Sequence, residues 1–572
     1  MQTQRTMSRR RFVRLAAVGA AGTAALPLLL NACGGSAQIS PSGAGSSGGS
    51  AAPAAGAASA SVPVSGATSG GKLLLPTHLP FQGPRPDYPA SANGVVPPGY
   101  LKYPSPLVKS VPTPPGSGGT VSGMTFTYSA APLGPDKNAA WAQVNKELNT
   151  SLTIPFTAQA DYTAKLNTLM ASGQLPDMFL LSFLGSTVQN EPQLLDSLCA
   201  DLTPYLSGDA VKTFPNLANL PQYTWKNGVY DNKLYMVPIQ PGGISGFSCL
   251  ANFQLLEPEG MTSFTSAADF RQKAKAFTQK GKRWMIGSGA FAWFPYVFRV
   301  PNQWRNDGGK LTRDLETEEY KATIAYLRQL WDDGVVYPDS PSQNLVQGAD
   351  NWDTGKYAIW FGGFTNYQRA WHNALKVDPK FNGHLLVPFP WDGKGKAVQN
   401  LGNGAYASIA LKKAGPARIK EVLGVLNFLS APFGTQEAQL LEYGVENVDF
   451  KYDAKGNPLL TAQGRKDLTV PWQNLGTSPQ VIYDPTNPEF TTATSKEESA
   501  IFALGVPDPV VGLYSPTSSA KGFSLDQKVR DGVNAVIYGR NPLSSWTQVV
   551  ADWRSGGGDQ IRTEFEKALQ QR

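Results

Sequence analysis

Strand-like and helix-like hydrophobic patterns alternate along the chain from residue 124 onward. A short apolar run at 124–128 precedes a segment in which Trp141, Val144 and Leu148 recur at the spacing of one helical face. A second strand and a second helix follow within 152–173, and the helix ends at a glycine. Strands that alternate with helices in this way predict a parallel, open α/β sheet, and such sheets bind ligands at the carboxyl ends of their strands.

Four later segments have the pattern of helices with one buried face. They cover residues 267–280, 317–333, 416–431 and 525–538. Ser266, followed three positions later by an acidic residue, forms a capping-box pattern in front of the first of these helices. A glycine or a proline follows each of the four segments closely, which is typical of helix ends. The apolar faces are interpreted as core, and no function is inferred from them.

The first 33 residues have the order of a secretory signal. Five arginines lie between residues 5 and 14, an apolar run follows at 15–30, and Cys33 comes three residues after its end. The apolar run has 16 positions, which is short beside the ~20 residues of a membrane-spanning helix. The opening, with the pair Arg9 and Arg10, resembles the twin-arginine export motif, although the general secretion route stays open. The approach to Cys33 resembles a bacterial lipoprotein box, which implies a lipidated cysteine and an extracytoplasmic protein anchored to the cell membrane.

Composition changes sharply after this signal. Residues 34–71 are almost entirely Gly, Ala, Ser, Pro and Thr, which predicts a flexible tether. Residues 72–119 are Pro-rich but contain aromatic and aliphatic side chains, which predicts an extended arm that lies against the folded body. Without residues 1–32 the chain keeps 45 Lys and Arg against 43 Asp and Glu, a net charge of about +2. A nucleic-acid partner needs a clustered basic surface, so this near-neutral balance argues against one.

Several short motifs occur in an order that resembles a known family. They are Gly173-Gln174-Leu175-Pro176-Asp177, Leu202-Thr203-Pro204-Tyr205-Leu206, and the segments 231–238, 317–336, 355–360, 443–448 and 556–568. In this order they resemble the extracellular solute-binding proteins of ABC importers, family 1, the group of the maltose-binding proteins and of larger oligosaccharide-binding lipoproteins. The resemblance covers about residues 120–572.

The resemblance implies a type II periplasmic-binding-protein fold: two α/β lobes joined by a hinge, with the ligand in the cleft between them. On this interpretation the chain comprises a signal peptide (1–32), a lipidated cysteine and tether (33–71), a Pro-rich arm (72–119), a first lobe (120–240 and 402–515) and a second lobe (241–401 and 516–572). Cys199 and Cys249 then belong to different lobes, which favours two separate buried thiols, while a disulfide between them remains the alternative.

Candidate ligand-binding residues lie in loops and at strand ends. They are Phe183, Trp293, Phe294, Phe364, Trp391, Asn403 and Trp472. Aromatic rings next to turn residues suit pyranose rings, because the C–H faces of a sugar stack on them while Asn, Asp and Gln side chains bind its hydroxyls. An ordinary core or surface aromatic is the alternative at each position, and Phe183 and Asn403 are chosen only because they follow strands.

The function predicted from the sequence is capture of an extracellular solute, most simply an oligosaccharide or sugar derivative, by a monomer that delivers it to a membrane permease. The alternative is a surface-anchored glycoside hydrolase, which would need two carboxylates across the scissile bond, and no motif identifies such a pair. No cofactor is implied. Some large oligosaccharide binders of the group carry a calcium loop, but residues 280–284 here offer Lys and Arg instead of oxygen ligands, so no metal is predicted there.

Overall fold

The computed structural model describes residues 68–69, 72–128, 130–183, 191–239 and 247–571. All of them belong to the unit Pro63–Arg572. The predictions for Arg9, Arg10, Cys33 and the tether lie outside the described residues. In the part of the chain that is described, we find no helix with the length and apolar character needed to span a bilayer.

The first lobe is built on a six-stranded sheet with the order β10-β18-β7-β4-β5, in which β6 also pairs with β4. Its strands are β4 (Thr120–Thr127), β5 (Ser151–Thr153), β6 (Phe156–Ala158), β7 (Met178–Phe183), β10 (Met236–Ile239) and β18 (Ala407–Leu411). The pairs that involve β4 are parallel, as the sequence predicts. The sheet is mixed rather than wholly parallel, because β18 pairs antiparallel with both β7 and β10.

Eight α-helices of the described residues belong to this lobe. They are α1 (Ala139–Leu148), α2 (Tyr162–Ala171), α3 (Glu191–Leu198), α4 (Thr203–Leu206), α5 (Pro215–Ala218), α12 (Pro416–Leu429), α13 (Gln436–Tyr443) and α14 (Gly464–Asp467). Among them, α1, α2 and α12 were predicted from the sequence. Helix α1 begins after Asn138, whose side chain accepts a hydrogen bond from the backbone N–H of Trp141. Trp141, Val144 and Leu148 are buried on one face of α1, which confirms the predicted stripe.

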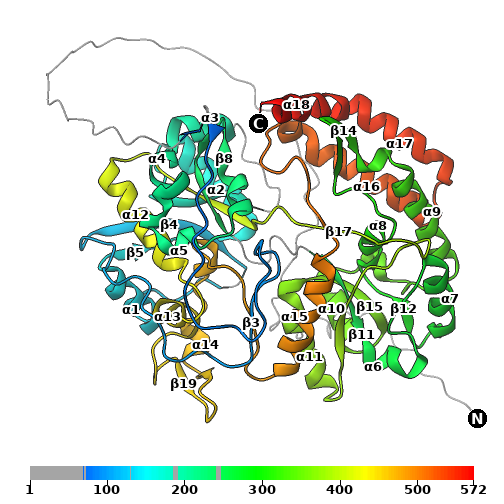
Figure 1. Cartoon of the computed structure of the whole chain (residues 1–572), viewed down its shortest axis with the longest axis horizontal. Helices are drawn as coiled ribbons and strands as arrows, with labels where there is room; N and C mark the ends of the chain where they lie inside the picture. The colour runs from blue at the N-terminus through cyan, green and yellow to red at the C-terminus, as the bar shows by residue number, and fades with distance from the viewer. Residues whose placement is uncertain (1–67, 70–71, 129, 184–190, 240–246, 572) are drawn as a thin grey trace, which may run out of the picture. The chain divides into compact units, whose positions relative to one another are not determined.

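The second lobe is built on a four-stranded sheet with the order β12-β15-β11-β16. Its strands are β11 (Phe247–Asn252), β12 (Trp284–Ile286), β15 (Tyr357–Gly363) and β16 (Gly383–Leu386). Its helices are α6 (Phe253–Leu256), α7 (Ala267–Phe277), α8 (Phe294–Val297), α9 (Glu318–Asp332), α10 (Leu345–Asp353), α11 (Phe364–Val377), α15 (Pro488–Phe502), α16 (Phe523–Ile537), α17 (Trp546–Trp553) and α18 (Asp559–Gln570). The C-terminal helix α16 packs beside α9 and α17 (Figure 1).

Predicted helix ends agree with the structure within a few residues. Ser266 caps α7 by accepting from the N–H of Asp269, although α7 ends at Phe277, earlier than predicted. Thr317 caps α9, and Gly334 follows that helix with a φ of 72°, a left-handed conformation that glycine adopts without steric cost. These ends are local features, which is why the sequence alone predicts them.

The chain returns from the second sheet to β18 of the first sheet through a short strand, which pairs with another short strand, and we call these two the hinge strands. β17 (Gln399–Asn400) pairs parallel with β22 (Gly505–Val506). Helix α15 lies within the range 402–515 that the sequence assigns to the first lobe, yet it packs on β16 of the second sheet. Its Phe490 and Phe502 belong to the same core as Trp360 of β15. The chain therefore reaches the second lobe before α15, because that helix buries its apolar face there.

The arm, residues 72–119, contacts both lobes. Near its start, the N–H groups of Thr77 and Leu79 donate to carbonyls of the first lobe. Further on, β3 (Gly99–Tyr100) pairs with β21 (Ile482–Tyr483), and the Tyr88 hydroxyl donates to Thr492 of α15. The remaining short strands are β1 (Thr68–Ser69), β2 (Lys72–Leu73), β8 (Val229–Tyr230), β9 (Lys233–Leu234), β13 (Trp304–Asp307), β14 (Lys310–Arg313), β19 (Phe450–Tyr452) and β20 (Pro458–Leu460).

The two cysteines of the folded body are free thiols. Cys199 and Cys249 are both fully buried, and they lie in the separate cores of the first and second lobes. The prediction of two separate buried thiols is confirmed, because each sulfur is enclosed by the apolar side chains of its own lobe.

Candidate ligand-binding site

A cavity of about 780 Å³ lies beside the hinge strands, and we call it the hinge cavity. The hinge contributes Asn400, Leu401, Gly402 and Asn403 to its wall, and the first lobe contributes Asn227. The second lobe contributes the rest, including Phe247, Tyr296, Asn302, Arg313, Asp314, Asp508, Asp526 and Arg530. This volume is within the ~300–1,000 Å³ of typical small-ligand pockets.

Side-chain amides hold the hinge in place at this cavity, and one of them, Asn302, is buried. The Nδ2 of Asn302, which is 7% exposed, donates to the carbonyls of Leu401 at 2.8 Å and Val506 at 2.9 Å. One side chain of the second lobe thus binds both Leu401, directly after β17, and Val506, the last residue of β22. Asn227 of the first lobe donates from Nδ2 to the carbonyl of Asn403 at 2.8 Å, and the Asn403 Oδ1 accepts from the N–H of Ala405 at 3.1 Å.

The hinge also contains amide oxygens without a hydrogen-bond donor. The Oδ1 of Asn400 and the Oε1 of Gln399 are buried, and neither has a hydrogen-bond partner in the structure. Unsatisfied buried acceptors are uncommon in native proteins and cost stability. They mark β17 as a strand whose side-chain hydrogen bonding is incomplete in this conformation.

Aromatic side chains form a platform at the hinge cavity. Phe247, the first residue of β11, is 44% exposed and stacks on Phe361 of the neighbouring strand β15, with ring centroids 5.6 Å apart and planes 17° apart. Tyr296 of α8 lies 6.3 Å from Phe361. A stacked pair with one exposed face offers a flat apolar surface to a ligand.

A second aromatic pair lies at the edge of the first sheet. Tyr128, directly after β4, is 44% exposed, and its hydroxyl is 2.8 Å from the hydroxyl of Tyr406, directly before β18. Both residues lie at the edge where β4 and β7 end, since β18 is antiparallel to β7. Burial raises the pKa of both phenols, so they remain neutral donors and acceptors at physiological pH.

Charged groups line the outer wall of the hinge cavity. The Arg313 guanidinium lies 3.4 Å from both Asp314 and Asp526, and its Nη1 donates to the carbonyl and the Oε1 of Gln303. Burial raises the pKa of Asp508 to about 6, although Arg313 opposes that rise. Burial also raises the pKa of Asp314 against the lowering by Arg313. Burial alone would lower the pKa of Arg313, but the neighbouring carboxylates outweigh it, and its pKa is raised.

The structure places four of the predicted aromatic residues in cores. Trp293 and Phe294 are fully buried, and the Trp293 ring packs against Phe294 and Phe389. Phe364 is 6% exposed in the second lobe, and Trp472 is 4% exposed in the first lobe. Their rings are covered by protein side chains in this structure, which corresponds to the core alternative considered for each position.

The other three predicted residues lie in different places. Asn403 lines the hinge cavity. Trp391 is 43% exposed and stacks on Phe298, 5.7 Å away with planes 10° apart, outside the lining of the hinge cavity. Phe183 is the last residue of β7 and pairs with Ala407, and its side chain is not among those described. Six of the seven predicted residues have described side chains. Of these six, Asn403 alone lines the hinge cavity.

The exposed aromatic residues Phe247 and Tyr128, and Phe361 beneath Phe247, were not among the residues predicted from the sequence. Tyr128 ends the first predicted strand, so the rule that ligands bind at carboxyl strand ends could have identified it. Phe247 follows a run rich in Gly and Pro, and it opens an apolar strand, which is a weaker signal of the same kind. Phe361 carried no such signal, because its contact with Phe247 depends on strand pairing over more than 100 residues.

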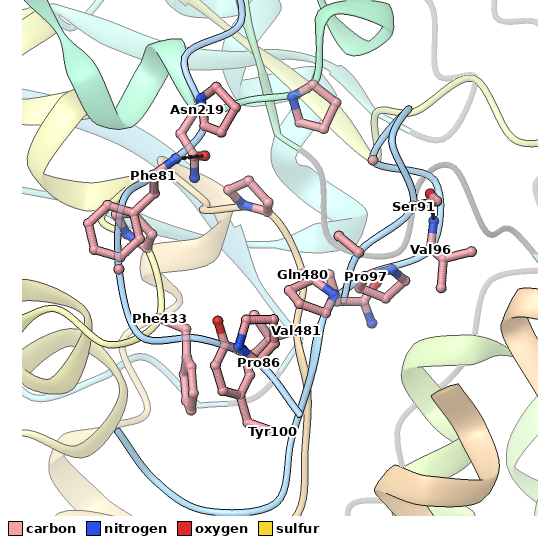
Figure 2. A pocket seen from close by; sticks show the side chains of 18 of the residues that line it. Phe81, Pro86, Ser91, Val96, Pro97, Tyr100, Asn219, Phe433, Gln480 and Val481 are labelled. Atoms are coloured by element: carbon pink, nitrogen blue, oxygen red, sulfur yellow. Dashed lines mark hydrogen bonds between the residues drawn. The ribbon is translucent and has the colours of Figure 1, made fainter. Parts of the chain in front are cut away.

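A second cavity, of about 410 Å³, lies between the arm and the first lobe. Figure 2 shows its wall, where the ring of Phe433 lies beside Tyr100, with centroids 4.9 Å apart. Its polar groups are largely occupied, since the Asn219 Oδ1 accepts from the N–H of Phe81 and the Ser91 Oγ accepts from the N–H of Val96. Proline, which has no N–H to donate, supplies many of its remaining lining residues. The hinge cavity therefore suits a hydroxyl-rich ligand better.

No group of three or more His, Cys, Asp or Glu side chains among the described residues is arranged to hold a metal ion. The carboxylates of the hinge cavity are instead engaged with Arg313 or with backbone N–H groups.

Comparison with known proteins identifies the family. Residues 139–430, just over half of the chain, match the profile of the family described as bacterial extracellular solute-binding protein. The chain belongs to this family. The resemblance inferred from the sequence motifs is thus confirmed, and so is the two-lobe α/β fold, which the solved structures of solute-binding proteins share.

Two relatives from Bacillus subtilis (strain 168) cover most of the chain. The polygalacturonan/rhamnogalacturonan-binding protein YtcQ is 26% identical over 464 residues, which are 76% of this chain and 89% of the relative. The lipoprotein LipO is 21% identical over 468 residues, with the same coverage of 76% and 89%.

Solved structures with the same fold include two solute-binding proteins of the family type. An extracellular solute-binding protein from Bifidobacterium longum subsp. infantis superposes with a TM-score of 0.59 at 13% identity, covering 79% of this chain and 98% of that one. The N-glycan transport solute-binding protein NgtS from Streptococcus pneumoniae superposes with a TM-score of 0.57 at 15% identity, also covering 79% and 98%.

Proposed function

We propose that this family member is the substrate-binding lipoprotein of an ABC importer and that it captures an extracellular carbohydrate in the hinge cavity. The observation that carries the proposal is the cavity of about 780 Å³ at the hinge, which combines amide side chains with the exposed Phe247 ring. Amides bind hydroxyls as both donors and acceptors, and an aromatic face stacks on the C–H face of a sugar. The names of YtcQ and NgtS, which specify polygalacturonan, rhamnogalacturonan and N-glycan ligands, support a carbohydrate.

Capture follows from the position of the cavity at the hinge. A ligand shifts the equilibrium between open and closed lobes only by the extra contacts that it makes in the closed state. Most of the lining residues belong to the second lobe and the hinge, and Asn227 belongs to the first lobe. A bound carbohydrate that contacts Asn227 as well would therefore favour closure, and the closed protein would dock on a permease whose ATPase supplies the energy.

We propose also that Arg9 and Arg10 direct export, that Cys33 carries the lipid anchor, and that the protein acts as a monomer. LipO, a relative named as a lipoprotein, supports the anchor. Substitution of Cys33 by Ser should move the exported protein from the membrane fraction to the soluble fraction, with loss of the lipid mass in intact-protein mass spectrometry. A Cys33→Ser protein that stays in the membrane fraction would contradict the anchor.

Binding without chemistry is tested by calorimetry followed by product analysis. The full-length protein is titrated with oligosaccharides, monosaccharides and peptides, and each ligand that binds is recovered and analysed by mass spectrometry. We expect carbohydrate binding, with the ligand recovered intact. A carbohydrate that is recovered cleaved would identify the glycosidase alternative, and binding of peptides alone would refute the carbohydrate class.

The site is tested by comparing exposed aromatic residues. Phe247→Ala should weaken carbohydrate binding about tenfold, because it removes a stacking surface worth ~0.5–1.5 kcal/mol beyond its buried area. Tyr452→Ala is the matched control. Tyr452 lies on β19 of the first lobe, outside the lining of the hinge cavity, and its exposed fraction of 42% is close to that of Phe247. Trp391→Ala tests whether the ligand instead binds at the exposed Trp391, outside the hinge cavity. A loss with Trp391→Ala and none with Phe247→Ala would move the site away from the hinge cavity.

A further inference from the structure

The charges around the hinge cavity bear on which carbohydrates it accepts. Five charged side chains line the cavity: Arg313, Arg530, Asp314, Asp508 and Asp526. Carboxylates thus outnumber guanidinium groups by three to two. A ligand carboxylate, as in a uronic acid, would approach more negative than positive groups, and like charges repel most where water is partly excluded.

Arg313 is the better buried of the two cations, and its donors are already engaged. Its side chain is 11% exposed and lies between Asp314 and Asp526. Its Nη1 donates twice to Gln303, at 3.1 Å to the carbonyl and at 2.9 Å to Oε1, and its guanidinium lies 5.5 Å from the Trp304 ring centroid. A uronate would therefore have to displace a protein carboxylate to form a bidentate pair with Arg313.

Arg530 offers little more to an anion. It is an exposed residue of α16, its Nη2 donates to Gln527 at 2.8 Å, and its guanidinium lies over the ring of Phe523. A charge in contact with bulk solvent is screened by salt, so it adds little selectivity. The segments 184–190 and 240–246 contain no charged residue in the sequence, so they add no cation wherever they lie.

Neutral donors and acceptors remain for the ligand. Asn227, Gln303, Asn400 and Asn403 line the cavity together with the exposed Phe247 face. From this charge arrangement we infer that the hinge cavity selects neutral oligosaccharides and discriminates against uronic-acid oligomers. The inference rests on the proposed carbohydrate-binding function and makes it more specific. The inferred preference for neutral ligands differs from the ligand in the name of YtcQ, because polygalacturonan is a polymer of an acidic sugar.

The test compares acidic ligands with uncharged ligands of the same length and closely similar shape. The full-length protein is titrated calorimetrically at low salt with tetragalacturonate and its fully methyl-esterified form, and with neutral and uronic oligomers of glucose and mannose of equal length. We expect each neutral ligand that binds to do so at least tenfold more tightly than its acidic partner, with the ratio falling as salt is added. Equal or tighter binding of the acidic partner overturns the inference while leaving carbohydrate binding intact. Binding of no carbohydrate in the series overturns the proposed function and the inference together.

Two variants test whether the wall carboxylates cause the discrimination. Asp526→Asn removes one of the anions that engage Arg313, so the affinity ratio of acidic to neutral ligand should rise more than fivefold. Asp531→Asn, on an exposed position of the same helix outside the cavity lining, is the matched control and should leave the ratio unchanged. The same ratio in both variants would refute the role assigned to the Arg313 ion pairs.

Discussion

A buried carboxylate of the first lobe holds the arm at Ser110 and Val111, and these contacts allow a quantitative prediction. Glu437 of α13 is 4% exposed. Its Oε2 accepts from the N–H and the Oγ of Ser110, both at 3.0 Å, and its Oε1 accepts from the N–H of Val111 at 2.9 Å. Three donors of the arm thus share one acceptor group, and we predict that Glu437→Gln releases this part of the arm.

The size of the effect follows from the hydrogen bonds. Hydrogen bonds to a charged group contribute ~1.5–3 kcal/mol each, whereas neutral ones contribute ~0.5–1.5 kcal/mol. The glutamine keeps one acceptor oxygen but replaces the other with an amide that faces an arm N–H, and that N–H loses its partner. We expect the segment around Ser110 to lose about 2–4 kcal/mol of local stability, limited by the free energy with which the arm is docked.

Hydrogen exchange measures this local loss directly. A change of about 2–4 kcal/mol corresponds to roughly 30- to 700-fold faster exchange of the Ser110 and Val111 amides. Tryptophan fluorescence in urea reports the body separately, because all 13 tryptophans lie outside the arm. Glu446→Gln is the matched control, since Glu446 is exposed just beyond the same helix. Unchanged exchange at both amides in Glu437→Gln, or an equal change in Glu446→Gln, would refute the reasoning.

Three further predictions concern the hinge and the buried groups. Asn302→Leu removes the donor to the carbonyls of Leu401 and Val506 and should lower the free energy of unfolding in urea by about 2–4 kcal/mol; a loss below ~0.5 kcal/mol would contradict a stabilising role of these two hydrogen bonds. Burial raises the pKa of Glu498 to about 8, so the native state holds a proton that the unfolded state releases near pH 4.5, and stability should fall from pH 5 to pH 8. In Glu498→Gln, the free energy of unfolding measured in urea should differ less between pH 5 and pH 8. A difference as large as that of the unsubstituted protein would contradict the prediction. Burial raises the pKa of Cys199 to about 12 and that of Cys249 well above its usual range, so iodoacetamide at pH 8 should label neither thiol in the native protein and both in urea, as mass spectrometry would show; labelling of the native protein would contradict the burial.

The sequence predicted the helices better than the sheets, because helix signals are local. The cap at Thr317 and the apolar stripe through Ile324 and Leu327 lie within one segment, and α9 follows them. The antiparallel β18 could not be predicted in the same way. It pairs with β7 and β10, which lie more than 150 residues earlier in the chain, and its apolar residues give no information about direction.

The lobe boundaries predicted from the sequence were limited in the same way, because they depend on contacts between residues far apart in the chain. The apolar face of α15 indicates that the helix is buried but not which sheet buries it. Phe490 and Phe502 contact the aromatic residues Tyr367 and Phe364 of α11, more than 100 residues away, and these contacts place α15 in the second lobe. A boundary drawn from motif order cannot include such contacts.

Candidate site residues depend on long-range contacts even more strongly. A tryptophan next to a turn fits a ligand platform and a core equally well, and the difference is decided by the residues that cover its face. Phe389 covers Trp293 from almost 100 residues away, whereas Trp141 covers Trp472 from more than 300. Asn403, which was predicted from its position after a strand, lines the hinge cavity, because chain topology rather than side-chain type brings hinge residues together.

The chemistry of the hinge links the fold to the proposed capture of a solute. Asn302 of the second lobe and Asn227 of the first lobe both donate to backbone carbonyls of the segment 401–403, so each lobe is fastened to the same short stretch of hinge. A ligand in the hinge cavity contacts the residues next to these two fastenings, and any movement of one lobe relative to the hinge changes the wall of the cavity. If the proposed function holds, we therefore expect the affinity for the solute to be coupled to the position of the lobes through these side-chain amides.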